Sequence, residues 1–81
     1  MYHRYHMKIR ITYCYDCGFT DQAIDLVGKL LGDFEDDIEE LTLVPASDGI
    51  FDVEVDGKMV HSKHKAGWFP EYDKLKTALG P

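Results

Sequence analysis

Two stretches of the chain alternate between apolar and polar residues. The first is Lys8–Tyr13 ("KIRITY") and the second is Ile50–Asp56 ("IFDVEVD"). Because successive side chains of a β-strand point to opposite faces, each stretch predicts a strand with one buried face and one polar face. Asp56 and Gly57 together are typical of a tight hairpin turn, so Lys58–Ser62 is predicted to be the returning strand.

Gly18–Leu31 changes to the spacing of an amphipathic helix. Its apolar stripe consists of Phe19, Ala23, Leu26, Val27 and Leu30. This spacing predicts a helix that packs one face against the sheet, and Gly32 with Asp33 is expected to end it. A last helix is predicted from Pro70, a residue that suits the first turn of a helix. Its buried stripe would comprise Phe69, Tyr72, Leu75 and Leu79.

Less regular segments connect these elements. Residues 34–40 ("FEDDIEE") are acidic and are expected to form a solvated loop. Leu41–Val44 is predicted to be a short strand that ends at Pro45. The segment that starts at this proline, "PASDG", has the residues of a turn.

The predicted order of elements is therefore β-α-β-β-β-α. A right-handed crossover makes the first two strands parallel neighbours, and the hairpin makes the last two antiparallel. Since each long strand has one polar face, both helices are expected to cover the other face. The predicted fold is an α/β two-layer sandwich of the thioredoxin-like type, with strand order 2-1-3-4.

Composition is that of a small globular domain. The 81 residues allow one domain, expected over residues 7–81, after a disordered extension at residues 1–6 ("MYHRYH"). The net charge of −6 disfavours nucleic acids and anionic membranes as partners. No apolar run approaches the ~18 residues of a membrane span, and no signal peptide is visible. A polar sheet face gives no reason for dimerisation, so we expect a monomer.

Cys14 and Cys17 are the only cysteines of the chain, three positions apart in "CYDC". Two cysteines are too few for a disulfide-stapled secreted scaffold, so a cytoplasmic location is expected. The pair falls where the first strand ends and the first helix begins. The positive end of a helix dipole stabilises a thiolate, the form that attacks disulfides. The pattern therefore predicts a thiol–disulfide oxidoreductase with Cys14 and Cys17 as its catalytic couple.

Three other interpretations of the pair remain open. His61 and His64 could join the cysteines in a Cys₂His₂ zinc site, although their spacing is shorter than structural zinc sites use. The cysteines could also be packing thiols without chemistry. Finally, the domain could be a redox-sensitive binding module, in which oxidation changes the affinity for a partner without turnover.

The topology brings further side chains towards the cysteines. Lys63 and Lys65 follow the last strand, and their positive charge would favour a thiolate and attract an acidic thiol such as glutathione. Asp16 lies between the cysteines, where its negative charge opposes thiolate formation. Trp68 and Phe69 are expected either to anchor the last helix or to form an apolar lip that receives a partner. The candidate substrate-binding residues are Lys63, Trp68 and Phe69.

Three ordered motifs together resemble the selenoprotein W family, also called Rdx. They are "ITYCYDCGF", "GIFDVEVDGKMVHSK" and "GWFPEYDKL", and the resemblance spans Met7–Leu79. It implies a thioredoxin-like redox domain with a glutathione-linked or peroxide-related antioxidant role. Its partners would be protein thiols, protein disulfides or glutathione, and neither a bound organic cofactor nor a metal is expected.

The resemblance also bears on which cysteine attacks. Selenoprotein members carry selenocysteine at the position of Cys17, so this chain resembles the cysteine-containing prokaryotic members. Thioredoxin-like logic instead makes Cys14 the nucleophile, and both assignments stay open. Thioredoxins also place a cis-proline directly before the strand that faces the active site. Here Gly49 precedes Ile50 and Pro45 lies further back, so the resemblance does not extend to that substrate clamp.

Overall fold

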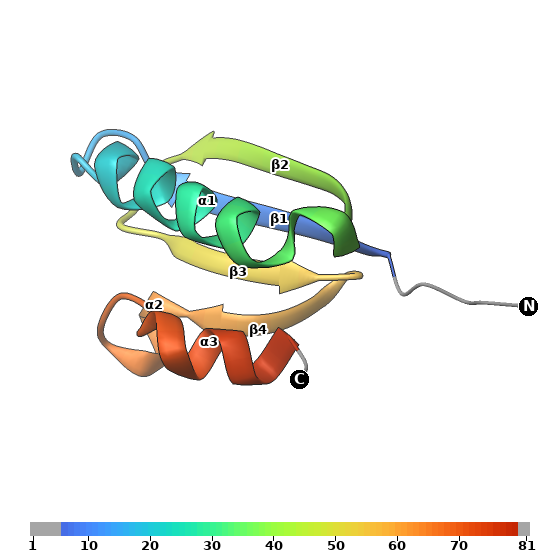
Figure 1. The fold of residues 1–81 in the computed structure, drawn as a ribbon. Coiled ribbons are helices and arrows are strands. Elements are labelled where there is room, and N and C mark those ends of the chain that lie inside the picture. Colours follow the sequence, from blue (N-terminus) through green and yellow to red (C-terminus); the bar gives the residue numbers. More distant parts are fainter. Residues whose placement is uncertain (1–5, 80–81) are drawn as a thin grey trace, which may run out of the picture.

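The computed structural model describes residues 6–79, and its elements follow the predicted order with two short additions (Figure 1). The strands are β1 (Met7–Cys14), β2 (Ile38–Ala46), β3 (Phe51–Val55) and β4 (Lys58–Ser62). The helices are α1 (Thr20–Phe34), α2 (Lys63–Ala66) and α3 (Tyr72–Leu79), with a 3₁₀ turn, η1 (Glu35–Asp37), after α1. The predicted extension over residues 1–6 lies, apart from His6, outside the described residues.

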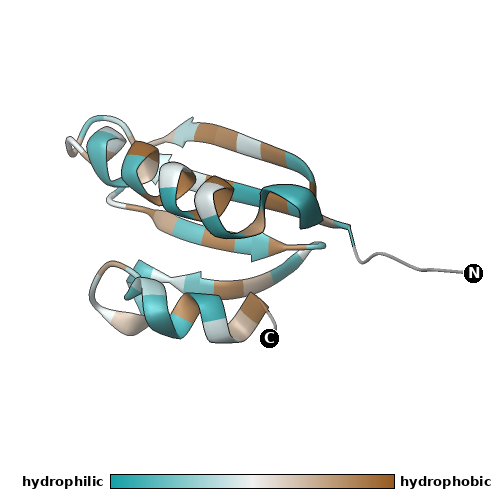
Figure 2. Ribbon diagram, in the orientation of Figure 1, coloured by the Kyte–Doolittle hydropathy of each residue, from teal (hydrophilic) through white to brown (hydrophobic). Residues whose placement is uncertain are grey.

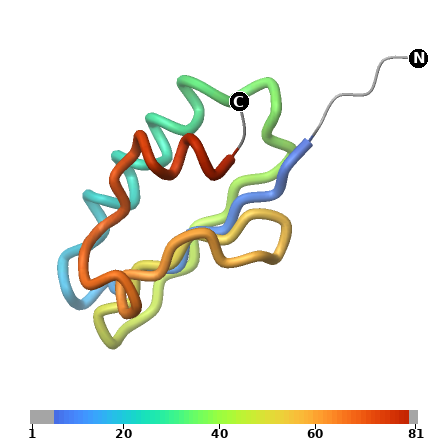
Figure 3. Tube along the Cα trace, turned by 90° about the horizontal axis from the view of Figure 1, so that it is seen from below, coloured from blue at the N-terminus to red at the C-terminus, as the bar shows by residue number. Residues whose placement is uncertain are grey.

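All four strands form one sheet in the order β2-β1-β3-β4. β1 runs parallel to β2 and antiparallel to β3, and β4 is antiparallel to β3. Figures 1 and 3 show α1 and α3 on the same side of this sheet. The predicted α/β fold with strand order 2-1-3-4 is confirmed.

The core fills the space between the sheet and these two helices. Figure 2 shows apolar residues alternating with polar ones along the strands. The buried side chains include Ile9, Ile11 and Tyr13 of β1, Ala23, Leu26, Leu30 and Phe34 of α1, Phe51 and Val53 of β3, and Leu75 of α3. Burying one large apolar side chain contributes ~1.5–3 kcal/mol. A slip of one residue in any strand would expose that strand's buried set, so the alternation fixes the register.

The helix α1 begins and ends later than the sequence predicted. It starts at Thr20 because Gly18, with a positive φ of 78°, still belongs to the turn after β1. It also continues through Gly32 to Phe34. Phe34 extends the buried stripe by one turn and is only 8% exposed. Burial of a phenylalanine contributes ~1.5–3 kcal/mol, which outweighs the ~1 kcal/mol cost of a glycine within a helix.

The strand β2 is longer than predicted at both ends. Residues 38–40, predicted as part of an acidic loop, form its first residues, and Ile38 and Glu40 pair with β1. Pro45 does not end the strand but lies within it, opposite Tyr13. Proline lacks an N–H donor, but an edge strand such as β2 can direct that position to solvent. No peptide bond among residues 6–79 is cis, so Pro45 does not provide the thioredoxin-type cis-proline.

The hairpin between β3 and β4 forms where the sequence predicted it. Asp56 and Gly57 have φ values of 53° and 83°, the left-handed conformation that a two-residue type I′ turn requires. After β4 the chain forms the short helix α2, which the sequence did not predict because its residues show no apolar periodicity. This helix ends at Gly67, whose N–H donates to the Lys63 carbonyl at 2.7 Å.

The last helix, α3, packs the stripe that the sequence predicted. Leu75 is buried, and Phe69, Tyr72 and Leu79 pack against the core as partly buried side chains. Within residues 6–79, no helix combines the length and the apolar character needed to cross a membrane.

Candidate functional site

Cys14 and Cys17 are joined by a disulfide. Their α-carbons lie 5.4 Å apart, within the ~4.4–6.8 Å that disulfide geometry allows. The structure thus brings together the two residues that the sequence singled out as a redox couple.

Backbone hydrogen bonds hold Cys14 at the end of the sheet. Its N–H donates to the Ile50 carbonyl at 2.8 Å, and its carbonyl accepts from the Phe19 N–H at 3.2 Å. The N–H of the next residue, Tyr15, donates to the Ala46 carbonyl of β2 at 3.0 Å. Cys14 therefore lies in a backbone frame to which the ends of β2, β3 and the disulfide turn all contribute.

Cys17 lies in the turn between β1 and α1 rather than in the helix. The helix begins three residues later, at Thr20, so the sequence placed Cys17 too close to the helix start. No side chain caps α1 through a hydrogen bond. The N-terminal end of α1 directly follows the disulfide turn, and the positive end of the helix dipole is not neutralised there by a capping side chain.

The two sulfur-bearing residues differ in their access to solvent. Cys14 is 0% exposed, whereas Cys17 is exposed, as are its neighbours Asp16 and Gly18. Thiol–disulfide exchange requires a sulfur that another thiol can reach. The geometry therefore favours Cys17 over Cys14 as the residue that exchanges with a partner.

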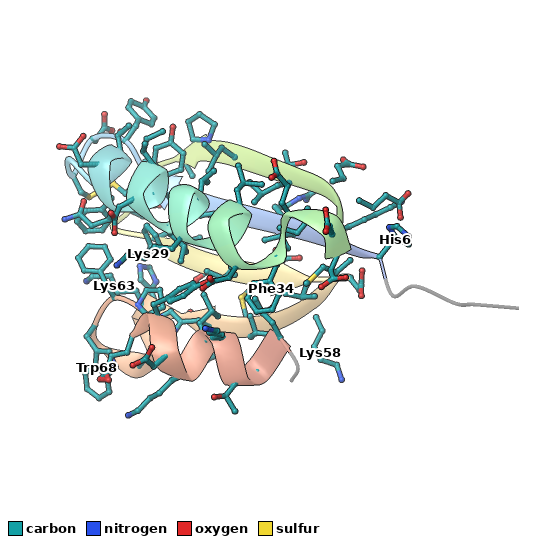
Figure 4. The ribbon with its side chains drawn as sticks, in the orientation of Figure 1. His6, Lys29, Phe34, Lys58, Lys63 and Trp68 are labelled. Carbon is teal, nitrogen blue, oxygen red and sulfur yellow. A yellow bond between two sulfur atoms is a disulfide. The ribbon has the colours of Figure 1, made fainter. Side chains whose placement is uncertain are left out.

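Lys63, at the start of α2, lies over two aromatic rings beside the disulfide turn (Figure 4). Its Nζ is 5.4 Å from the ring centroid of Phe19 and 5.6 Å from that of Phe69. A cation over the face of a ring is attracted by the ring's quadrupole, which holds Lys63 in place. No carboxylate of residues 6–79 forms a salt bridge with it. Lys65 is exposed on the same short helix.

Phe69 and Trp68, adjacent in sequence, differ in their packing and exposure. Phe69 packs edge to face against Phe19, with ring centroids 4.8 Å apart, and against Phe51 at 5.2 Å. It therefore anchors the segment before α3 to the core. Trp68 is 62% exposed and lies at the same end of the molecule as Lys63 (Figure 4). Its ring is available to contact a partner.

His61 and His64 both make hydrogen bonds to backbone carbonyls. Nε2 of His61 donates to the Trp68 carbonyl at 3.0 Å, and Nε2 of His64 donates to the Asp48 carbonyl at 2.9 Å. Within the described part of the chain, no group of three or more His, Cys, Asp or Glu side chains could hold a metal ion. The structure does not assemble the Cys₂His₂ site of the zinc alternative.

Sequence reasoning missed one residue near this end of the sheet. Asp52 lies on β3, opposite Thr12 of β1 and Ser62 of β4. Its Oδ1 atom is buried and has no hydrogen-bond partner among the described residues. The alternation of β3 assigns Asp52 to the polar face, and no local sequence pattern signals that one oxygen of a carboxylate is buried.

Comparison with known proteins identifies close relatives. Residues 8–80 match the model of the Rdx family. Selenoprotein W of Danio rerio is 34% identical over 80 residues, which cover 90% of this chain and 91% of that protein.

Solved structures with the same fold cover nearly the whole chain. A selenoprotein W-related protein from Vibrio cholerae has a TM-score of 0.85 and 30% identity, covering 89% of this chain and 90% of its own. A protein from Bordetella parapertussis has a TM-score of 0.86 and 32% identity, covering 90% of this chain and 92% of its own.

Proposed function

This chain belongs to the Rdx family of selenoprotein W-like proteins, and we propose that it is a small thiol–disulfide redox protein. The working couple is Cys14 and Cys17. The observation that carries the proposal is their disulfide, in which one partner is buried and the other is exposed. The proposed location is the cytoplasm, whose reducing conditions would keep the couple as a dithiol.

Cys17 is the attacking residue in this proposal. Its exposure supports the assignment, as does the positive end of the α1 dipole next to its turn. The Cys17 thiolate attacks a sulfur of the partner disulfide and forms a mixed disulfide. Cys14, held within reach, then attacks Cys17 and releases the partner's second thiol.

The proposed partners are protein disulfides and glutathione, with no bound organic cofactor. Lys63 offers a positive charge that has no salt-bridge partner among residues 6–79 and lies near the disulfide turn, which suits a partner that carries a carboxylate close to its sulfur. Trp68 offers an exposed apolar surface at the same end of the molecule.

A second candidate function is a binding module whose affinity depends on the state of the couple. The 62% exposure of Trp68 favours it, because a large exposed apolar side chain at the same end of the molecule as Lys63 suits docking. Turnover separates the two functions. A module binds its partner differently when oxidised but does not reduce a disulfide.

The test is to trap the mixed disulfide. Reduced wild type, Cys14→Ser and Cys17→Ser are each mixed with a model peptide linked to glutathione by a disulfide, and the products are read by mass spectrometry. Cys14→Ser is expected to accumulate an adduct at Cys17, while wild type ends as the internal disulfide with released thiols. Cys17→Ser is expected to form little adduct. If the adduct forms on Cys14 instead, the roles are reversed; if neither variant forms one, the redox function is wrong.

A further inference from the structure

One carboxylate oxygen of Asp52, Oδ1, is buried and does not contact solvent. The residue as a whole is partly exposed, but Oδ1 is buried and lacks a hydrogen-bond partner among the described residues. Nor does Asp52 form a salt bridge within residues 6–79. Leaving a buried polar atom without a partner costs ~1–3 kcal/mol, and more for a charged group. An unsatisfied group of this kind calls for a specific explanation, such as a catalytic role or an ordered water.

The strand register puts Asp52 close to Cys14. β1 and β3 are antiparallel with Thr12 opposite Asp52, and the Cys14 N–H continues the ladder to the Ile50 carbonyl. Cys14 and Asp52 are therefore diagonal neighbours on one face of the sheet, a relationship that sets α-carbons roughly 7–8 Å apart. A carboxylate can reach a sulfur across that gap directly or through one water.

Cys14 needs a proton acceptor in the second half of the proposed reaction. Once Cys17 has formed the mixed disulfide, the Cys14 thiol must lose its proton before it can attack. Cys14 is 0% exposed, so bulk water does not reach its sulfur. His61 pairs with Val53 and therefore lies on the other face of the sheet, His64 is hydrogen-bonded to the Asp48 carbonyl, and Asp16 lies in the exposed turn. On the sheet face of Asp52, the next charged pair is Arg10 opposite Glu54, two positions further from Cys14 along each strand.

We propose that Asp52 takes the proton from Cys14 during closure of the internal disulfide, an inference that rests on the proposed function. The inner oxygen Oδ1 lies on the buried side, where it can receive the proton, and the partly exposed remainder of the side chain gives the proton a way out to solvent. The proposal explains why Oδ1 of Asp52 is buried without a partner, and it gives the buried Cys14 thiol a proton acceptor.

The proposed reaction transfers two electrons in two exchange steps. The Cys17 thiolate attacks one sulfur of the partner disulfide; a bond from Cys17 to the partner forms, and the partner's other sulfur leaves as a thiolate that takes a proton from water. The Cys14 proton then passes to Asp52, and the Cys14 thiolate attacks Sγ of Cys17. The bond between Cys17 and the partner breaks, its electron pair leaves with the partner sulfur, and Asp52 returns the proton to that thiolate or to water. Two electrons have passed from the cysteine pair to the partner.

The experiment measures adduct formation and closure as separate steps. Reduced protein is mixed rapidly with glutathione disulfide, quenched with acid at successive times, and analysed by mass spectrometry for the Cys17 adduct and the internal disulfide. Three variants accompany wild type. Asp52→Asn keeps the size of the side chain but removes the proton acceptor, and Asp52→Glu keeps the acceptor but enlarges the side chain. Glu54→Gln is the matched control, since it neutralises the next acid on the same strand and the same sheet face.

Asp52→Asn is expected to slow closure about 10²-fold, the low end of the ~10²–10⁴ typical for loss of a proton-transfer group, while the adduct forms at the wild-type rate. Asp52→Glu is expected to recover most of the closure rate, and Glu54→Gln to match wild type. Closure at the wild-type rate in Asp52→Asn would overturn the inference alone. So would slower closure in Asp52→Glu than in Asp52→Asn, because a purely structural role depends on size rather than on a proton acceptor. A wild-type protein that forms neither adduct nor internal disulfide would overturn the proposed function itself.

Discussion

The Tyr72 hydroxyl lies 2.8 Å from Oδ2 of Asp33, and this contact joins α3 to the end of α1. The same hydroxyl is 3.0 Å from the Lys29 carbonyl, and Lys76 adds a salt bridge of 3.5 Å to the same carboxylate. The segment that leads into α3 carries Phe69, which packs on Phe19 next to the disulfide turn. Contacts at one end of α1 therefore help to hold the surroundings of the cysteines at the other.

Replacing Tyr72 with phenylalanine is expected to lower the free energy of unfolding by about 1 kcal/mol, because the hydroxyl loses its partners on α1. Urea unfolding at pH 7 measures this. Tyr15→Phe is the control, since Tyr15 is 57% exposed and its hydroxyl forms no hydrogen bond within residues 6–79. Equal stability of the two variants would show that the Tyr72 contact adds nothing.

The stability that Tyr72 contributes is also expected to be lost at alkaline pH. Burial, and then the hydrogen bond to Asp33, raise the pKa of Tyr72 to about 12, whereas an unfolded tyrosine ionises near ~10. Because the folded chain holds the phenol proton more tightly, the contribution to stability is complete below pH ~10 and is lost as the pH rises towards ~12. The stability gap between wild type and Tyr72→Phe should therefore narrow across this interval in urea titrations. A gap that stays constant to pH ~12 would argue against the raised pKa.

The same contact is expected to contribute less to the stability of the fold in acid, because it depends on the ionised carboxylate of Asp33. The hydrogen bond from Tyr72, followed by the charge of Lys76, lowers the pKa of Asp33 below its usual value of 3.8. The ionised carboxylate therefore stabilises the fold above that pH, and its contribution is lost as the pH falls through the lowered pKa. Acid unfolding followed by circular dichroism should begin at a higher pH in wild type than in Asp33→Asn, once both curves are scaled to their stability at neutral pH. Superimposable curves would exclude this contribution.

Lys63 is expected to set a preference for anionic partners. Lys63→Met should slow exchange with glutathione disulfide about fivefold, as expected for the loss of ~1 kcal/mol of attraction between unit charges ~4 Å apart in water. Exchange with an uncharged disulfide of similar size should change little. Lys65→Met is the control, because Lys65 has no aromatic contact among the described residues. The same loss in both variants would indicate net charge rather than the position of Lys63.

Asp16 is expected to restrain the reactivity of its neighbour. Its exposed carboxylate lies between the two cysteines in sequence and disfavours a second negative charge on Cys17. Asp16→Asn should therefore raise the rate of Cys17 alkylation by iodoacetamide at pH 7 by about two- to fivefold, with a smaller increase in high salt. Asp21→Asn, an exposed acid in the first turn of α1, provides the comparison. A rate that falls in Asp16→Asn would contradict this role.

The fold was predictable where one face of a strand or helix is buried, because the apolar residues then recur at a regular spacing in the sequence. β1, β3 and β4 emerged within a residue of their bounds because alternation and the hairpin turn at Asp56 and Gly57 act on the local chain. The length of β2 was underestimated because its acidic residues and Pro45 are typical of loops, and its pairing with β1 cannot be read from the sequence. The helix α2 lacks an apolar stripe, so only its tertiary setting beside β3 and β4 explains it.

The candidate site divides in the same way. The spacing of Cys14 and Cys17 is a local property, and it indicated the disulfide. The difference in their exposure is a tertiary property, because Cys14 is enclosed by segments around Ala46 and Ile50 that are distant in sequence. The buried oxygen of Asp52 was hidden for the same reason, since alternation assigns a whole side chain to one face and cannot assign its atoms.

Equilibration in glutathione buffers of stepped redox ratio decides whether Cys14 and Cys17 form a working couple. At each ratio the protein is quenched, alkylated, and its cysteine peptide is read by mass spectrometry. We expect one reversible two-electron transition between dithiol and internal disulfide, with the same midpoint from either direction, and no such transition in Cys14→Ser. A protein that stays a dithiol at every ratio, or that oxidises only to products which glutathione does not reverse, would contradict the proposed function.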